Sequence, residues 1–238
     1  MMRGTLSGME RILETDIPKG TVILIKGDAG TMKTAFTFNV MHEYLKDRPD
    51  EFGVYMSLEQ TRESHLMNMH SIGMPDIPNL IISDFWECRR EFGKGLERDN
   101  ILDLVINLLT FFSSQKKGRF TVFALDSLNI MYDLSSGKID RDRMYQTLER
   151  LRELNLYSFL ILESPSNHSA HSSFCQSMPY GSESFMTDGI IEMGTVDTKD
   201  DVIRYIQIRK MRSVKHSMKR FQFRVENGRL QIMRPVYD

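Results

Sequence analysis

Cysteines, long apolar runs and net charge are scarce in this sequence, and each scarcity argues against a class of protein. The 238 residues include only two cysteines, Cys88 and Cys175, whose wide separation fits no metal-ligand pattern and predicts reduced thiols. No stretch approaches the roughly 18 apolar residues of a membrane-spanning helix, and the first residues lack the apolar core of a signal peptide. The net charge is only -1, which gives no support for nucleic-acid or membrane binding. We therefore expect a cytoplasmic protein without a membrane span.

The sequence does contain enough apolar residues for a full core. Hydrophobic residues make up 41% of the chain and charged residues 26%, a balance that is typical of globular proteins. A chain of this length can bury one α/β core, and no repeat, low-complexity tract or linker marks a boundary inside it. We predict a single domain over residues 1–238.

Short apolar runs alternate with helical patterns along the first part of the chain. The predicted strands are Thr21 to Ile25, Phe52 to Leu58, Leu80 to Ser83, Phe120 to Leu125 and Tyr157 to Leu162. One predicted helix begins at Lys33, and the others are Thr61 to His70, Ile101 to Phe112 and Ile139 to Asn155. This alternation predicts an α/β fold with a mostly parallel central sheet and helices on both faces.

The remaining segments predict loops and an antiparallel C-terminal extension of the sheet. We expect a surface loop over Trp86 to Arg98 and a mobile loop over Ser164 to Ser184, which is rich in Ser, His, Pro and Gly. Further strand patterns follow at Gly189 to Met193, Val202 to Lys210, Met218 to Val225 and Leu230 to Met233. The last two flank Glu226-Asn227-Gly228, a strong hairpin signal.

Residues 27 to 34, GDAGTMKT, nearly match the phosphate-binding pattern G-x-x-x-x-G-K-[ST], with Met32 in place of the second glycine. An apolar strand precedes the segment and a helical pattern follows it, as a phosphate-binding turn requires. We expect backbone N–H groups to face the phosphates of a nucleotide, Lys33 to neutralise them and the Thr34 hydroxyl to reach Mg²⁺. The predicted nucleotide-binding residues are Gly27, Asp28, Ala29, Gly30, Thr31, Met32, Lys33, Thr34 and Ala35.

The missing glycine leaves two alternatives for the backbone of this turn. A positive φ at Met32 would cost on the order of 1–2 kcal/mol, which many phosphate contacts can offset, whereas a negative φ would cost nothing. The alternative to a phosphate-binding turn is a chance match in an unrelated turn, and the flanking strand and helix argue against it.

Polar residues follow the predicted parallel strands, where ligands of open α/β sheets bind. Asp126 has the form of a Walker B aspartate, which holds Mg²⁺ directly or through a water, although alone it would be interpreted as a turn cap. Glu59 is the candidate for orienting an attacking water, with a solvated acid at a helix start as the alternative. Gln60 can orient a water but cannot take its proton.

The segments GDAGTMKT, VYMSLEQ, TVFALDSL, YGSESFMTDGIIEM and IRKMRSVKH, in this order, resemble the RecA/RadA-type ATPase core, and specifically its KaiC-like branch. The resemblance spans nearly the whole chain and implies a RecA-like P-loop NTPase fold that binds ATP and Mg²⁺. It also implies a homo-oligomeric ring, a hexamer in this family, in which a basic turn reaches the γ-phosphate bound by the neighbouring subunit. The residues implied for that turn are Lys210, Met211 and Arg212, and less directly His216.

The catalytic residues predicted in this way are Lys33, Glu59, Lys210 and Arg212, and the metal-binding residues are Thr34 and Asp126. From the residues alone, the basic turn would be interpreted as a solvated hairpin tip or as a nucleic-acid contact. The assignment of the basic turn therefore rests on the resemblance, whereas the assignment of the phosphate site rests on the P-loop pattern.

Three positions depart from the family's pattern. Met32 and Ser213 stand where glycine is usual, and Gln60 replaces a second glutamate. Because the lysine, threonine and aspartate of the site are retained, we expect ATP binding with slow hydrolysis, in regulation or signalling. The alternatives are a non-catalytic, nucleotide-dependent scaffold or assembly subunit with a protein partner, and a DNA recombinase. The absence of Lys and Arg from residues 164 to 184 argues against the recombinase.

Overall fold

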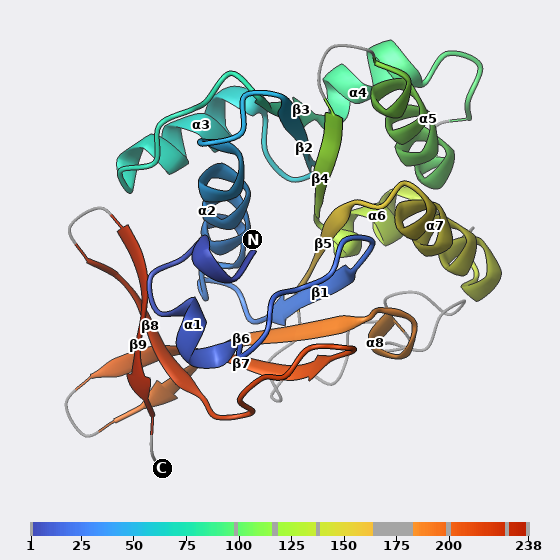
Figure 1. The fold of residues 1–238 in the computed structure, drawn as a ribbon. Coiled ribbons are helices and arrows are strands. Elements are labelled where there is room, and N and C mark those ends of the chain that lie inside the picture. The colour runs from blue at the N-terminus through green and yellow to red at the C-terminus, as the bar shows by residue number, and fades with distance from the viewer. Residues whose placement is uncertain are drawn as a thin grey trace.

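The structure, a computed structural model, is built on a nine-stranded sheet (Figure 1). It describes residues 2–97, 100–115, 119–136, 139–163, 183–198, 201–226 and 229–236. The strands lie in the order β3-β2-β4-β5-β1-β6-β7-β8-β9. Neighbours from β3 to β6 are parallel, and those from β6 to β9 are antiparallel. The predicted α/β fold, with a mostly parallel sheet and an antiparallel extension, is confirmed.

The parallel part of the sheet is made of the predicted apolar runs. Its strands are β1 (Val22–Gly27), β2 (Glu51–Ser57), β3 (Leu80–Asp84), β4 (Arg119–Asp126), β5 (Tyr157–Glu163) and β6 (Gly189–Asp197). Gly27 of β1 pairs with Glu163 of β5, and Ser57 of β2 pairs with Asp126 of β4. The last residues of β1, β2, β4 and β5 therefore lie along one edge of the sheet, which we call the carboxyl edge.

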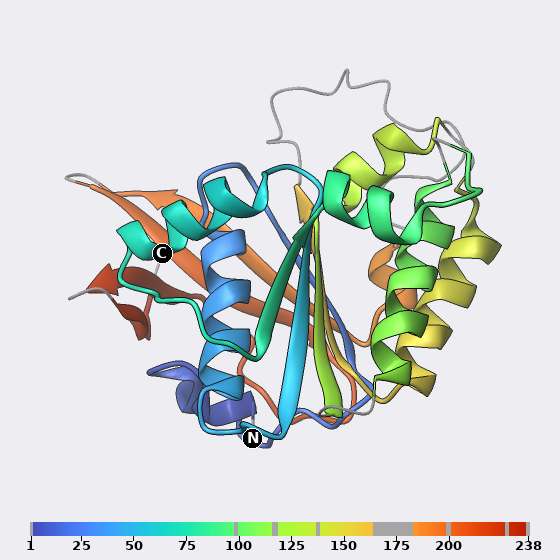
Figure 2. The same ribbon diagram turned by 90° about the horizontal axis from the view of Figure 1, so that it is seen from above.

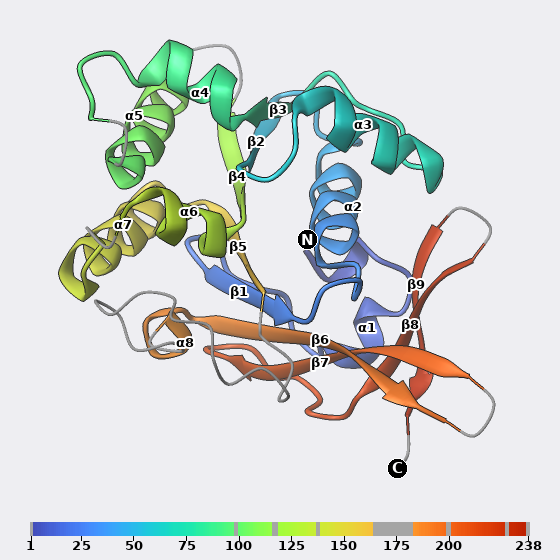
Figure 3. The same ribbon diagram turned by 180° about the vertical axis from the view of Figure 1, so that it is seen from behind.

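The antiparallel extension consists of β7 (Val202–Met211), β8 (Phe221–Glu226) and β9 (Arg229–Pro235). Figure 3 shows β8 and β9 at the end of the sheet remote from α5 and α7. β8 begins later than the pattern from Met218 predicted, because the preceding segment pairs with the N-terminal part of the chain. His216 forms a bridge with Leu13, and the Ser217 N–H donates to the Ile12 carbonyl at 2.8 Å.

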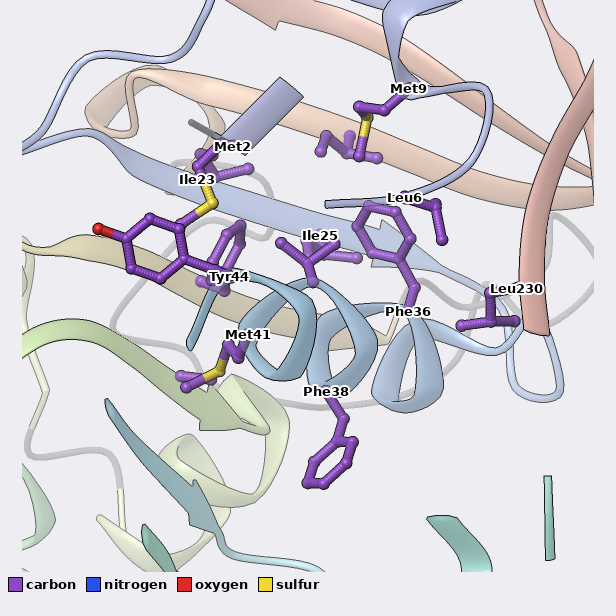
Figure 4. Packing of buried hydrophobic residues seen from close by; sticks show 14 of the residues in the cluster. Met2, Leu6, Met9, Ile23, Ile25, Phe36, Phe38, Met41, Tyr44 and Leu230 are labelled. Atoms are coloured by element: carbon purple, nitrogen blue, oxygen red, sulfur yellow. The ribbon is translucent and has the colours of Figure 1, made fainter. Parts of the chain in front are cut away.

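One face of the sheet is covered by α2 (Lys33–Leu45) and α3 (Arg62–Ser71), together with α1 (Met9–Ile12) and the 3₁₀ turn η1 (Met2–Gly4). Buried side chains lie on nearly all sides of α2, because this helix packs between the sheet and the N-terminal segment. Figure 4 shows Phe36 and Tyr44 of α2 beside Ile23 and Ile25 of β1. This packing fixes where α2 begins, and therefore where Lys33 and Thr34 lie.

The other face is covered by α5 (Ile101–Ser114) and α7 (Arg141–Glu153), with α4 (Phe85–Phe92) and α6 (Leu128–Leu134) packed beside them. In Figure 2 the central strands run between α2 on one side and α5 and α7 on the other. The short helix α8 (Glu183–Met186) precedes β6. No described helix combines the length and the apolar character that crossing a bilayer requires.

Three local predictions need correction. The strand pattern from Gly189, expected in the antiparallel extension, is β6, which pairs parallel with β1 and antiparallel with β7. The first part of the segment from Trp86 to Arg98 is not a loop but helix α4, because Asp84 caps it by accepting from the Glu87 N–H at 2.9 Å. Cys88 is the only fully buried residue of α4, so no apolar repeat marked this helix. Helix α6 was not predicted either. Of the predicted loop from Ser164 to Ser184, residues 164 to 182 lie outside the described residues.

Candidate functional site

The near-P-loop forms the turn between β1 and α2 at the carboxyl edge. Gly27 ends β1 where a Cβ atom would come within 1.9 Å of the Met193 carbonyl oxygen, so only glycine fits there. Gly30 has φ 77°, a conformation that glycine adopts without steric cost. The Asp28 carbonyl accepts from the Thr31 hydroxyl at 2.8 Å, which closes the turn. Strand, turn and helix therefore follow one another as the pattern predicts.

Met32 takes the left-handed conformation that the missing glycine would have taken. Its φ is 71° and its ψ 29°, at the residue that precedes the first turn of α2. Its side chain is half-buried against the core beneath α2, and no side-chain cap closes the helix start. Of the two alternatives for Met32, the structure has the strained one, with a cost on the order of 1–2 kcal/mol.

Lys33 is buried at the first position of α2. Its ammonium group donates to the Asp28 carbonyl at 2.9 Å and lies 3.4 Å from Glu163 Oε1 at the end of β5. Ala35 is buried in the core, so that only its backbone can face a ligand at the helix start, whereas Ala29 is exposed on the turn. The first N–H groups of α2 and the Lys33 ammonium therefore place positive charge at the carboxyl edge, where an anion can bind.

Thr34 and Asp126 lie in direct contact at this edge. The Thr34 hydroxyl donates to Asp126 Oδ2 at 2.7 Å, although 92 residues separate the two in sequence. Asp126 is only 5% exposed, and this burial raises the pKa of its carboxyl to about 6, while hydrogen bonds from Tyr55 and Thr34 oppose the rise. The order of the strands produces this contact. Asp126 ends β4, which lies beside β5, and β5 ends at Glu163, the ion-pair partner of Lys33.

This pair fits a magnesium ion. A hydroxyl and a carboxylate are hard oxygen ligands, and Mg²⁺ in phosphate sites takes one or two protein ligands with water and phosphate oxygens. Among the described residues no group of three or more His, Cys, Asp and Glu side chains could hold a metal alone. The donor set is therefore that of a metal shared with a phosphate rather than that of a metal held by the protein only.

Glu59 lies exposed just after β2, on the same edge. Its carboxylate accepts a hydrogen bond from the hydroxyl of Ser127, the residue after Asp126. Gln60 is turned toward α3, where its carbonyl oxygen accepts from Asn68 Nδ2 at 3.1 Å. The structure therefore brings Glu59 to the edge occupied by Lys33 and Asp126, and holds the Gln60 amide in a different contact.

The basic turn, which begins in the last residues of β7, lies at the other end of the sheet. Met211 pairs with Gly189, which pairs with Ile23 near the start of β1, whereas the P-loop follows the end of β1. The Lys210 ammonium donates to the Ser184 carbonyl at 3.0 Å and to the Thr187 carbonyl, and burial lowers the pKa of Lys210. Within one chain, the basic turn and the phosphate-binding turn are not brought together.

The side chains around the basic turn are held by local contacts. Arg212 donates to Asp188 Oδ1 at 3.2 Å, and His216 Nδ1 lies 2.9 Å from the Val214 carbonyl oxygen. Ser213 has φ 60°, so the second position where the family has glycine is also left-handed.

Sequence reasoning missed two side chains of the site. Tyr55 of β2 donates from its hydroxyl to Asp126 Oδ2 at 2.6 Å, and Arg204 of β7 donates from Nε to the Gly30 carbonyl at 2.9 Å. The period of two along β2 puts Tyr55 on the same face as Ser57, which pairs with Asp126, so Tyr55 could have been found from a known strand order. Arg204 carries no such signal, because it is 174 residues from Gly30.

Comparison with known proteins identifies relatives of this chain. Residues 2–237 match the family described as ATPase: KaiC. The circadian clock oscillator protein KaiC of Picosynechococcus sp. is 22% identical over 236 residues, and the circadian clock protein KaiC3 of Synechocystis sp. is 23% identical over 235 residues. These alignments cover 97% of this chain but only 44% and 45% of the two relatives. The chain therefore spans less than half the length of the curated relatives that it matches.

The fold is similar to that of a KaiC-like protein from Pyrococcus horikoshii, PH0186. That crystal structure superimposes with a TM-score of 0.72 over 96% of both chains, at 22% sequence identity. The similarity confirms the RecA-like fold, and the family match supports an ATP-binding protein. Because that match covers nearly the whole sequence, the chain belongs to the KaiC ATPase family.

Proposed function

We propose that this protein binds ATP with Mg²⁺ and hydrolyses it slowly, as a ring-shaped oligomer that works in regulation or signalling. The observation that carries the proposal is the contact between Thr34 and Asp126, 2.7 Å long, beside a P-loop lysine at the carboxyl edge. A P-loop pattern by itself predicts phosphate binding, whereas a threonine bonded to a strand-end aspartate adds a place for a metal.

Each residue of the carboxyl edge has a separate task in this proposal. Lys33 and the first N–H groups of α2 bind the phosphates, and Thr34 and Asp126 hold Mg²⁺. The metal, when bound, neutralises charge on the phosphate oxygens. Glu59 orients the attacking water and accepts its proton, and the Ser127 hydroxyl restrains the Glu59 carboxylate at the strand end.

Slow turnover follows from the residue next to Glu59. An amide cannot accept a proton from water at neutral pH, and the Gln60 amide is bonded to Asn68 on α3. One carboxylate therefore does the work that a pair would share. Strain at Met32 is a smaller effect, because it acts on the loop backbone and leaves Lys33 and Thr34 in place.

The ring is proposed from the separation of the two predicted halves of the site. Lys210 and Arg212 lie at the start of β1 and the P-loop lies at its end, so a second subunit is needed to bring them together. Family membership supports such an assembly. We further propose that residues 1–238 form one ATPase domain and that the protein is cytoplasmic, in keeping with the free, buried thiol of Cys88.

A second candidate function is a nucleotide-dependent scaffold that binds ATP without hydrolysing it. The contacts of Glu59 with Ser127 and of Gln60 with Asn68 favour it, because both polar side chains that follow β2 already have partners. In this case the occupied and empty states differ in assembly or in partner binding rather than in product formation.

Phosphate release from purified protein with ATP and Mg²⁺ separates the two functions. The proposed ATPase predicts slow release in the wild type, none above background in Lys33→Ala, and at least about 100-fold less in Glu59→Gln with unchanged ATP affinity. Glu63→Gln is the matched control, since Glu63 is an exposed acid in the first turn of α3. Equal release from wild type and Glu59→Gln would remove Glu59 from its role.

Size-exclusion chromatography with light scattering, run with and without ATP, tests the ring on the same samples. We expect the molar mass to rise to a multiple of 27.7 kDa when ATP is present. A monomer under both conditions would contradict the ring, and nucleotide binding without phosphate release would favour the scaffold.

A further inference from the structure

Tyr55 is a fully buried residue whose polar group touches the phosphate site. Its side chain is 0% exposed, and its hydroxyl donates to Asp126 Oδ2 at 2.6 Å. The same oxygen accepts from the Thr34 hydroxyl at 2.7 Å. A buried hydroxyl needs a hydrogen-bond partner, and this one has the carboxylate that we assign to the metal. Tyr55 therefore contacts the proposed metal site through its hydrogen bond to Asp126 Oδ2.

The ring of Tyr55 is fixed from two sides by aromatic neighbours. Phe38 of α2 lies edge-on with a centroid distance of 6.2 Å, and His65 of α3 lies 4.5 Å away. Phe38 leaves α2 on the side opposite to Phe36 (Figure 4) and follows Thr34 by four residues, so one helix face carries both the Thr34 hydroxyl and a support for the Tyr55 ring. The two donors to Asp126 are therefore held relative to each other.

His65 contributes packing rather than hydrogen bonds to this arrangement. It is 1% exposed, and neither of its ring nitrogens has a hydrogen-bond partner among the described residues. Since it donates to nothing at the site, it cannot replace the Tyr55 hydroxyl. Two hydroxyl groups, that of Tyr55 on β2 and that of Thr34 on α2, therefore set the orientation of Asp126 Oδ2.

We propose that Tyr55 is a positioning residue for Mg²⁺, whose hydroxyl holds Asp126 beside Thr34 so that the two oxygen ligands meet the metal as a preformed pair. This inference rests on the proposed function, because it deepens the account of the same site. Removing a hydrogen bond to a metal-ligating carboxylate typically lowers metal affinity about 10- to 100-fold. Nucleotide binding without metal depends on Lys33 and the loop backbone, and the Tyr55 hydroxyl touches neither in the described contacts.

The chain offers a matched pair of variants for the test. Tyr55→Phe removes one hydroxyl and keeps the ring between Phe38 and His65. Tyr44→Phe removes an equivalent bond, from a buried tyrosine to Glu51 Oε2 at 2.7 Å, at the first residue of β2 and hence away from the carboxyl edge. Both variants lose a hydroxyl bonded to a carboxylate, and only one of these carboxylates belongs to the site.

The measurement is the affinity for a fluorescent ADP analogue, first in EDTA and then as a function of free Mg²⁺. We expect Tyr55→Phe to need at least about 10-fold more Mg²⁺ for the half-maximal metal-dependent change, with unchanged affinity in EDTA. Tyr44→Phe should match the wild type in both. Thermal unfolding of each variant verifies the fold, and in an Asp126→Asn background Tyr55→Phe should cause no further loss.

Three results would overturn the inference. The first is an unchanged Mg²⁺ midpoint in Tyr55→Phe, and the second is an equal loss of affinity with and without metal, which marks a role in the fold only. The third is a wild type that binds the analogue with no response to Mg²⁺. A wild type that binds no nucleotide at all would instead overturn the proposed function, and this inference with it.

Discussion

The two ends of β1 carry the two halves of the predicted site, and they differ in how they are held. At its carboxyl end, Thr34 donates to Asp126 and Lys33 donates to the Asp28 carbonyl, all within one chain. At its amino end, Lys210 and Arg212 are bonded to carbonyl groups near α8 and to Asp188. Candidate phosphate and metal ligands are assembled at the first end, whereas the basic residues at the second end are bonded to groups outside that site.

This difference teaches what one subunit can do alone. The carboxyl edge already has groups that can bind phosphate, metal and water, so a single chain can bind a nucleotide. Asp188 accepts from Arg152 as well as from Arg212 and from the Val22 N–H at 3.1 Å. The amino end therefore has a structural role within the chain, and any role of Arg212 in hydrolysis requires a neighbouring subunit.

The largest expected effect tests whether the carboxyl edge binds the phosphates. Lys33→Ala should weaken ATP binding about 1000-fold, because several charge-assisted hydrogen bonds to the phosphates are lost together. Lys26→Ala is the control, since Lys26 lies on β1, the strand that leads into the P-loop, but pairs with Glu192 at 3.6 Å. Isothermal titration calorimetry measures both. Similar losses in the two variants would show that a lysine near the P-loop matters only through net charge.

The next effect tests whether the amino end acts on another subunit. Arg212→Ala should reduce phosphate release at least about 100-fold, while Arg209→Ala, on the preceding strand β7, should not. Mixing equal amounts of Arg212→Ala and Lys33→Ala subunits should restore about a quarter of the wild-type rate, since one neighbouring pair in four then has both intact residues. A mixture as inactive as its components would contradict action across an interface.

A smaller effect concerns His65, the buried histidine that packs against Tyr55. Burial lowers the pKa of His65 to about 4, below its ordinary value of 6.5, so the unfolded chain takes up a proton before the folded chain does. The free energy of unfolding should therefore fall by about 2 kcal/mol between pH 8 and pH 5 through this residue. The fall is the difference between urea unfolding of wild type and of His65→Phe.

His70→Phe is the control for this measurement. His70 lies on the same helix but is half-exposed beside Asp76, at 3.1 Å. Its replacement should leave the pH dependence through His65 in place. If His65→Phe and the wild type lose stability equally on acidification, the buried imidazole is not the cause.

The smallest effect compares the two left-handed residues that stand where the family has glycine. Ser213→Gly should stabilise the protein by about 0.5–1 kcal/mol, because glycine removes the strain of a positive φ at an exposed turn. Met32→Gly should gain less, since it also removes a half-buried side chain from the core beneath α2. Thermal unfolding ranks the two. A larger gain from Met32→Gly would mean that strain outweighs packing at the P-loop.

Much of the fold was predictable from local patterns. β-branched runs marked β1 and β4, and helical periodicity marked α2, α5 and α7, because each of these elements buries one face or both. Helix α4 was missed because a single buried residue, Cys88, gives no period. The region from 164 to 182 lies outside the described residues, so the mobile loop expected there stays a prediction.

The sequence by itself determined the order of strand, turn and helix around the P-loop, and it identified Lys33, Thr34 and Asp126, because these depend on neighbours in the chain. Only the tertiary structure decided that Tyr55 shares an oxygen with Thr34 and that Arg212 lies at the far end of β1. Such contacts depend on which strands pair and in which register. Strand pairing is set by burial across the whole sheet, and no local pattern encodes it.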